Sequence, residues 1–310
     1  MGFFEGLWDV VSSATMYESA FRLAVLLAFA AVGEWVAERS GTLNISIEAM
    51  LLGGAFASVI GFGWSHSAIV GVLCGAAAGT TVGAAHANLS HRLTANQFVV
   101  GLTLNVLVIG LTGFLDAQIN PDGGRAKLVE IPVLSDIPLV GRAFFAQAWP
   151  AYLVYAIIPI AWYLVFRTRW GLEIRSVGEN PQAADVSGIH VNLRRRQALY
   201  LCGLFAGLGG AYLVLGQVGR FQTAMTNGRG YLAIAAVIFG GWSLRGTIAG
   251  CVVFGVADAM RVALPSLGYQ LNGALLALLP YLLALLTMLF FATRSREPSA
   301  LAQPFVRGLK

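Results

Sequence analysis

The sequence contains a series of predominantly apolar runs of about 20 residues, and this feature restricts the fold more than any other. A run of this length crosses the hydrocarbon core of a bilayer when it forms a helix. Two shorter pieces, Tyr231–Phe239 and Thr247–Ala263, follow each other and are broken by GGWSLRG. The longer candidate spans are Phe21–Val36, Ile45–Phe62, Ala68–Leu89, Phe98–Leu115, Trp149–Phe166, Gln197–Gly216 and Gly273–Phe291.

These runs predict an all-α polytopic membrane protein that forms one transmembrane domain over residues 1–310. We expect a bundle of about eight or nine transmembrane helices, including a broken or re-entrant pair. The composition agrees, because 57% of the chain is hydrophobic and only 11% is charged, against about 25% charged in soluble domains. The basic residues are scattered through loops and form no patch for nucleic acid, and the acidic N-terminus does not resemble a signal peptide.

The distribution of basic residues predicts the orientation in the membrane. Residues 167–196 carry six of the twenty Lys and Arg residues, and short loops rich in these residues stay in the cytosol. Residues 116–148 carry mixed charges and several prolines, so we expect this loop to be external. Counting spans then places the N-terminus outside, while the basic tail after Phe291 is cytosolic. Nine crossings, or seven plus a re-entrant hairpin, both satisfy these charges.

The cytosolic loop 167–196 also contains the signals of a short helix. Asn180 can cap its start, Pro181 suits the first helical position, and Gly188 can close its end. A structured cytosolic projection indicates a surface that contacts a soluble partner. The Arg194–Arg196 run that follows is expected at the lipid surface, at about 1 kcal/mol per residue near anionic head groups.

Glycine predicts how the helices pack. A small-residue stripe along one helix face allows close backbone approach, which drives association of helices in lipid. We expect this stripe to pack inside the bundle in preference to forming a subunit interface. The glycines are Gly71, Gly75, Gly79 and Gly83, with Gly203 and Gly207, then Gly246 and Gly250, repeating the spacing.

Polar residues inside the spans are candidate functional groups, because they are costly in lipid unless they face protein or a water-filled path. Gly101, Asn105 and Thr112 share one helical face, and Asn96 and Gln97 stand at the inner entrance of that span. Such groups suit a path for an uncharged, hydrogen-bonding solute. A helix–helix hydrogen bond made by Asn105 is an equally good interpretation.

The acidic residues in the spans receive different interpretations. Glu34 and Glu38 lie one turn apart next to Arg39, so we expect a snorkelling or ion-paired turn. Glu48 has no basic neighbour within one helical turn, which makes it a stronger functional candidate. Asp258 and Arg261, three residues apart, are predicted to pair within their helix.

The sequence shows no catalytic chemistry of its own. It has no phosphate-binding loop, no zinc-protease motif and no serine-nucleophile elbow. The three cysteines lie inside apolar stretches without metal-ligand spacing or a disulfide framework. We therefore predict no enzyme, no cofactor and no metal site, and any energy for transport must come from elsewhere.

Five blocks of the sequence resemble permease subunits of ABC importers for nucleosides and simple sugars, the branched-chain amino acid/ribose-type permease family. They occur in the family's order and cover most of the chain. The resemblance is closer to the nucleoside-type members than to the ribose-only ones. The blocks are GEWVAERSGTLNISIEAMLLGGAF (Gly33–Phe56), ANQFVVGLTLNVLVIGLTGFL (Ala95–Leu115), GLEIRSVGENPQAADVSGI (Gly171–Ile189), GLFAGLGGAYLVLGQVGRF (Gly203–Phe221) and GRGYLAIAAVIFGGWSLRGTIAGCVVFGVADAM (Gly228–Met260).

The resemblance implies a multi-pass protein of the bacterial cytoplasmic membrane with several partners. These are a second homologous permease, a cytosolic ATPase and an extracytoplasmic substrate-binding protein. The capped helix would dock on the ATPase through Glu179, Asn180, Pro181, Ala184, Asp185 and Gly188. The path would be lined or gated by Asn44, Glu48, Asn96, Gln97, Asn105, Phe114 and Trp242.

A different class of function remains open at this stage, namely a self-sufficient secondary transporter or facilitator of a small polar solute. It would need ion coupling, for which the spans offer Glu34, Glu48 and Asp258. A membrane enzyme would need a nucleophile–base or metal arrangement, and the sequence contains neither. Transport without an ATPase or ATP distinguishes the secondary transporter from the importer subunit.

Overall fold

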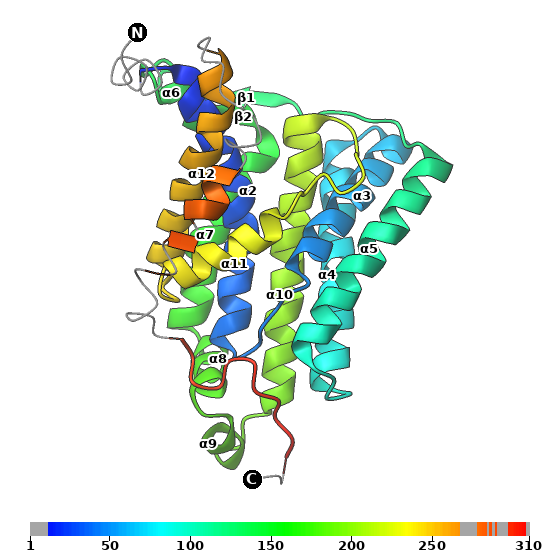
Figure 1. Cartoon of the computed structure of the whole chain (residues 1–310), viewed down its shortest axis with the longest axis vertical. Coiled ribbons are helices and arrows are strands. Elements are labelled where there is room, and N and C mark those ends of the chain that lie inside the picture. The colour runs from blue at the N-terminus through cyan, green and yellow to red at the C-terminus, as the bar shows by residue number, and fades with distance from the viewer. Residues whose placement is uncertain (1–11, 267–277, 284, 287–288, 290–296, 308–310) are drawn as a thin grey trace.

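The computed structural model describes residues 12–266, 278–283, 285–286, 289 and 297–307, and these are mainly helical (Figure 1). The longer helices run side by side along the long axis of the molecule. In chain order the elements are α2 (Ala14–Arg39), α3 (Ile47–Ser65), α4 (Ala68–His91), α5 (Gln97–Ile119), β1 (Leu128–Glu130), α6 (Gly141–Phe145), β2 (Ala146–Ala148), η1 (Trp149–Tyr152), α7 (Leu153–Arg167), α8 (Arg169–Glu179), α9 (Pro181–Val186), α10 (Val191–Ala211), η2 (Tyr212–Val218), α11 (Arg229–Phe239) and α12 (Leu244–Ser266).

Seven stretches of the described residues are long and apolar enough to cross a membrane. Six of them contain most or all of a predicted long span. About half of the seventh predicted span, Gly273–Phe291, lies outside the described residues, and its described residues are helical. Arg294, Arg296 and Lys310 of the tail also lie outside them. The stretches are Ala14–Arg39, Ile47–Ser65, Ala68–His91, Gln97–Ile119, Trp149–Arg167, Val191–Val218 and Leu244–Pro265.

The break at GGWSLRG contains fewer residues than the sequence indicates. The chain turns at residues 240–243 between α11, which has 11 residues, and α12, which has 23. The prediction of two short pieces is therefore wrong for the second piece. Leu244 to Gly246 are already helical, because the Ser243 hydroxyl oxygen accepts a hydrogen bond from the Gly246 N–H at 3.2 Å and caps the helix.

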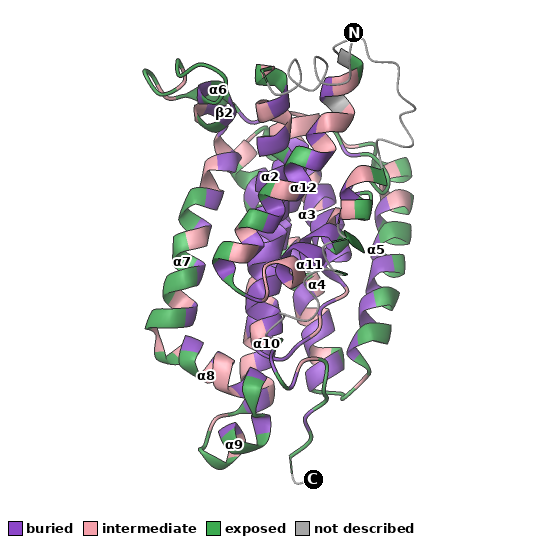
Figure 2. Cartoon of the chain, turned by 60° about the vertical axis from the view of Figure 1, so that its left-hand side comes forward, coloured by how far each residue is buried: buried purple, intermediate pink, exposed green. Residues whose placement is uncertain are grey.

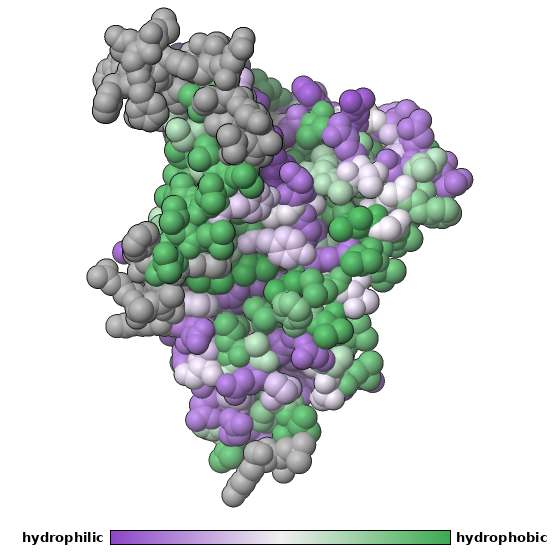
Figure 3. All heavy atoms as spheres, in the orientation of Figure 1, coloured by the Kyte–Doolittle hydropathy of each residue, from purple (hydrophilic) through white to green (hydrophobic). Residues whose placement is uncertain are grey.

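Most of the segments that connect the helices lie at two opposite ends of the bundle (Figure 1). Loop 116–148 lies at one end and includes α6 and an antiparallel pair of strands, in which Leu128 pairs with Ala148 and Glu130 with Ala146. The protein is therefore not strictly all-α. Helices α8 and α9 and residues 297–307 lie at the other end. Hydrophobic residues cover much of the middle of the face in Figure 3, and hydrophilic residues collect toward its lower end.

Helix α2 lies at the centre of the bundle. Most of it from Leu23 onward is buried, and Figure 2 shows this buried core surrounded by helices with exposed outer faces. Helix α4 packs so closely on α10 that a Cβ at Gly79 would overlap the backbone of Gly203 and Gly207. The predicted packing of the glycine stripe inside the bundle is confirmed.

Two helices begin in the middle of the bundle, between its two ends (Figure 1). Residues 40–46 run without helical structure from the end of α2 into the protein, where α3 begins. Helix α11 begins at a similar height, after η2 and a connecting loop. A non-helical segment in the core needs side chains to bind its backbone groups. Gln97 supplies one of them, because its amide oxygen accepts a hydrogen bond from the Leu43 N–H at 2.8 Å.

Candidate functional site

The internal starts of α3 and α11 meet at a cluster that we call the α3–α11 junction: Glu48, Asn105, Gly228, Gly230 and Tyr231. The Glu48 carboxylate accepts hydrogen bonds from the N–H groups of Gly228 and Gly230, each at 2.7 Å. These groups form the positive N-terminal end of α11, which a carboxylate stabilises. Glu48 is 5% exposed. Its partner is a helix end, which explains why the sequence shows no basic neighbour.

Asn105 of α5 joins the same junction. Its amide oxygen accepts the Ala49 N–H at 2.9 Å. Its amide nitrogen donates to the Ile45 carbonyl and to the Tyr231 hydroxyl, both at 2.9 Å. Asn105 therefore makes the helix–helix hydrogen bonds that the sequence allowed, and contact with a solute remains a prediction. Tyr231 was not singled out from the sequence, although it lies in the block Gly228–Trp242 that the family resemblance assigns to the path.

A second buried network surrounds Asn44 in the segment that leads to α3. The Asn44 amide nitrogen donates to Glu34 at 2.8 Å, and its amide oxygen accepts the Ser46 hydroxyl at 2.8 Å. The Ser46 hydroxyl lies 2.7 Å from the His86 Nδ1 atom of α4. Asn44 therefore links α2 to α4 through hydrogen bonds and holds the non-helical segment in place.

Glu34 and Glu38 do not form the predicted snorkelling or ion-paired turn. Both are buried, and neither makes a salt bridge in the described part of the chain. Glu38 accepts a hydrogen bond from the indole N–H of Trp242, whose carbonyl accepts the Trp35 indole N–H at 2.8 Å. The prediction failed because α2 runs through the centre of the bundle, where no head group can be reached. Trp242 is fixed in this packing.

The other predicted path residues lie apart from the junction. Asn96 caps α5, since its amide oxygen accepts the N–H groups of Phe98 and Val99 at 2.9 and 3.2 Å. Gln97 supports the start of the non-helical segment, as described above. Phe114 is 63% exposed on the outer side of α5. The structure brings Glu48 and Asn105 together and leaves Asn96 and Phe114 outside the cluster.

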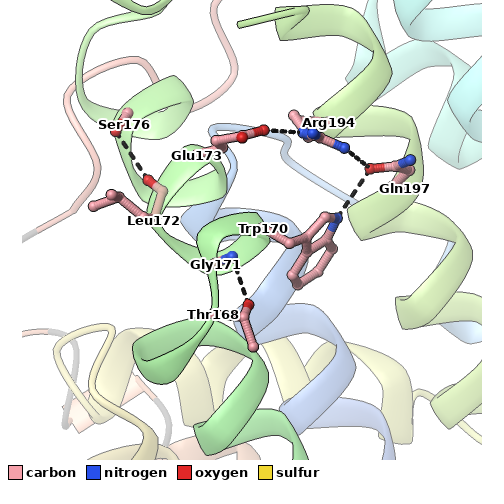
Figure 4. Close-up of polar contacts among 8 residues, drawn as sticks. All are labelled: Thr168, Trp170, Gly171, Leu172, Glu173, Ser176, Arg194 and Gln197. Carbon is pink, nitrogen blue, oxygen red and sulfur yellow. Dashed lines mark hydrogen bonds and ion pairs between the residues drawn. The ribbon is translucent and has the colours of Figure 1, made fainter.

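The short helix predicted in loop 167–196 is confirmed as α9. The Asn180 amide oxygen accepts the Ala183 N–H at 3.0 Å, and Pro181 follows at the first helical position. Gly188 has φ +87° and its N–H donates to the Asp185 carbonyl at 2.9 Å. Helix α8 was missed, although Thr168 caps it by accepting the Gly171 N–H at 3.1 Å (Figure 4).

The exposed surface of α9 differs from the predicted one. Ala184 is buried against Val177, Val191 and Phe305, so it cannot contact a partner directly. Val186 is 90% exposed and was not among the residues predicted to dock. Two other predicted coupling residues bind the tail: the Glu179 carboxylate accepts the Ser299 hydroxyl, and Asp185 pairs with Arg307.

The Arg194–Arg196 run does not lie as a unit at a lipid surface. Helix α10 begins at Val191, six residues before the predicted span, so the run is helical. Arg194 binds Glu173 and donates to the Gln197 amide oxygen at 2.8 Å (Figure 4). Arg195 is fully buried and donates to backbone carbonyls, among them that of Ser40 at 3.1 Å. Helical periodicity therefore separates neighbouring arginines that the sequence groups together.

Residues 16–292 match the family described as branched-chain amino acid transport system / permease component. The chain belongs to this family. Together with the seven apolar helices, this membership makes it a multi-pass protein of the bacterial cytoplasmic membrane and the permease subunit of an ABC importer. The protein therefore corresponds to the component that crosses the membrane.

Several curated relatives of the permease align over most of its length. The nucleoside ABC transporter permease protein NupC of Lactococcus lactis is 32% identical, over 88% of this chain and 91% of the relative. The guanosine ABC transporter permease protein NupQ of Bacillus subtilis is 33% identical, over 92% and 94%. The ribose import permease protein RbsC of Escherichia coli is 29% identical, over 74% of this chain and 72% of the relative.

Proposed function

We propose that this permease carries a nucleoside across the membrane past the α3–α11 junction, driven by an ATPase that docks on α9. Two relatives, at 32% and 33% identity, are named as nucleoside and guanosine permeases, and these names support the substrate class. A third, at 31% identity, is named as a putative glucose permease of Haloferax volcanii, so glucose is the competing solute. The observation that carries the path is the meeting of two helix starts inside the bundle. Broken helices in transporters commonly place their N-terminal ends at the substrate site.

The chemistry of the junction suits a nucleoside. Glu48 neutralises the positive N-terminal end of α11. Tyr231 accepts a hydrogen bond from Asn105 while 41% of the residue remains exposed. An aromatic ring with an accessible surface stacks on a nucleobase, and the Tyr231 hydroxyl, which accepts from Asn105, can donate its own O–H. Tyr231 is therefore the residue we add to the predicted path.

The ATPase docks, in this proposal, on the exposed side of α9. The cytosolic partner is required because the sequence has no phosphate-binding loop. Val186 places an apolar side chain almost entirely in solvent on a short capped helix that is anchored by buried Ala184. Burial of this side chain by a partner is favourable, because it removes apolar surface from water.

The topology that fits these roles has nine crossings, with loop 116–148 outside and α8–α9 in the cytosol. Helix α11 is about 16 Å long, too short to cross alone, and completes one crossing together with the loop before it. Helix α12 begins at the α9 end of the bundle and runs away from it, while residues 297–307 lie at that end again (Figure 1). One further crossing, at the predicted span Gly273–Phe291, restores the chain to the cytosolic side. A second homologous permease and an extracytoplasmic binding protein complete the proposed importer.

Reconstitution tests this function. The permease with its ATPase, second permease and binding protein in proteoliposomes should take up radiolabelled guanosine only when ATP is present on the ATPase side. Uptake by the permease alone, without ATP, would show a facilitator and overturn the proposal. Preference for ribose over guanosine would retain the importer and reject the nucleoside.

The Val186→Asp variant tests the docking helix. We expect co-purification of the ATPase to fall by about tenfold or more, since a charge in an apolar pocket is strongly unfavourable. The folded permease should be unaffected, because the side chain is 90% exposed and contacts little of its own chain. Leu172→Asp, an exposed residue on α8, is the matched control. Equal ATPase recovery for wild type and Val186→Asp would rule out docking through this residue.

A further inference from the structure

The described tail residues 297–307, which we call the tail strap, lie across the end of the bundle that carries α8 and α9 (Figure 1). The Ala300 N–H donates to the Gly178 carbonyl at 2.9 Å, at the end of α8. Ser299 binds Glu179 at 3.1 Å, and Arg307 forms an ion pair with Asp185 of α9, also at 3.1 Å. The strap therefore contacts α8 and α9 with both backbone and side chains.

An apolar contact joins the strap to the buried side of α9. Phe305 packs with Val177 of α8, Ala184 of α9 and Val191 of α10 in one cluster, and all four residues are buried. Helix α9 has six residues, which is too few for stability on its own. Its position therefore depends on this cluster, to which the strap contributes the largest side chain.

The other side of the strap binds the transmembrane bundle. The buried Arg195 guanidinium donates to the Gln303 carbonyl of the strap at 2.7 Å and to the Ser40 carbonyl at 3.1 Å. The Ala302 N–H donates to the Gly41 carbonyl at 3.2 Å. Ser40 and Gly41 begin the non-helical segment that leads to Asn44 and the α3–α11 junction. A buried guanidinium is always charged and needs all these acceptors, so the attachment is strong.

We propose that the tail strap transmits the position of α9 to residues 40–46 and thereby links ATPase docking to the α3–α11 junction. The inference rests on the proposed docking of the ATPase at α9. Two rigid attachments carry it: Phe305 and Arg307 on the α9 side, and Arg195 with Gly41 on the bundle side. Arg307, Phe305 and Arg195 are positioning residues, since none of them contacts solute.

The test uses the complete importer in proteoliposomes and measures solute transported per ATP hydrolysed. Reversing one charge of the exposed ion pair, in Asp185→Arg or Arg307→Asp, should lower this ratio by about threefold or more while changing the thermal midpoint little, because exposed pairs contribute little stability. The exchanged double variant should restore the ratio to within about twofold, as expected for two directly coupled residues. Arg92→Asp, an exposed arginine at the end of α4, is the control.

Phe305→Ala provides a second measurement that does not depend on charge. It should lower the ratio of transport to hydrolysis more than either charge reversal, since it removes the buried ring that supports Ala184. If all strap variants keep the wild-type ratio while Val186→Asp loses the ATPase, the strap proposal is wrong and docking at α9 stands. If Val186→Asp also keeps the ATPase, the docking proposal itself fails.

Discussion

The α3–α11 junction and the α9 end of the molecule each use a carboxylate to fix a short helix, in opposite surroundings. Glu48 is buried and binds two backbone N–H groups at the start of α11. Asp185 pairs with Arg307, whose side chain is 72% exposed. A buried group leaves unpaired donors behind when it is removed, whereas an exposed ion pair is replaced by water. A carboxylate therefore fixes structure at the junction, whereas at α9 it only adjusts position.

The difference also concerns what each region offers to a partner. At the junction, Asn105 and Glu48 make their hydrogen bonds within the protein, and Tyr231 is the residue that remains accessible. At α9, the polar residues bind the tail strap, and the accessible surface belongs to Val186. In both regions the residues that hold the site are distinct from the residue that is free to bind.

Removal of the Glu48 carboxylate should give the largest effect and tests the junction most directly. Glu48→Ala leaves the Gly228 and Gly230 N–H groups without a partner, at about 1–3 kcal/mol each. We expect a lower thermal midpoint in detergent and loss of nearly all transport. Glu48→Gln retains an acceptor oxygen, so its thermal midpoint and its uptake should lie between those of the wild type and Glu48→Ala. If Glu48→Ala kept the thermal midpoint and the uptake of the wild type, the buried carboxylate would be no more important than the exposed one at Asp185.

Substitution of Asn105 should have the next largest effect. Asn105→Leu keeps the branched shape of the side chain but leaves the Ala49 N–H and the Ile45 carbonyl unpaired, again at about 1–3 kcal/mol each. Assembly with the partners should persist while the rate of uptake falls by about tenfold. A tenfold change corresponds to about 1.4 kcal/mol of free energy. Tyr231→Phe, which removes only the hydroxyl, is the matched comparison. A higher KM in both variants supports solute contact, whereas an unchanged KM assigns Asn105 to packing alone.

Phe114→Ala should have the smallest effect. The ring lies on the exposed side of α5, away from the junction, and exposed positions usually change stability by about 0.5 kcal/mol or less. Uptake and thermal midpoint should match wild type. A marked loss of uptake would place Phe114 on the solute path, as the family resemblance first suggested, and would extend the functional surface to the outer side of α5.

Local signals in the sequence predicted a large part of the fold. The lengths of the apolar runs gave six of the membrane-spanning stretches, because each depends only on its own residues. The cap of α9 was predicted residue by residue, since Asn180, Pro181 and Gly188 act within one turn of their positions. The glycine stripe also predicted close helix contact, because small residues permit it regardless of the partner.

The tertiary structure alone decided which polar residues meet. Glu48 and Gly230 are 182 residues apart, and Trp242 and Glu38 are 204 apart, so no local pattern relates them. The sequence predicted a snorkelling or ion-paired turn at Glu34 and Glu38, because it could not show that α2 is the central helix. It grouped Arg194 to Arg196, whereas the start of α10 places Arg195 in the interior and leaves Arg194 and Arg196 partly buried. Charge, length and caps are local properties, whereas burial and long-range hydrogen bonds depend on how the helices pack.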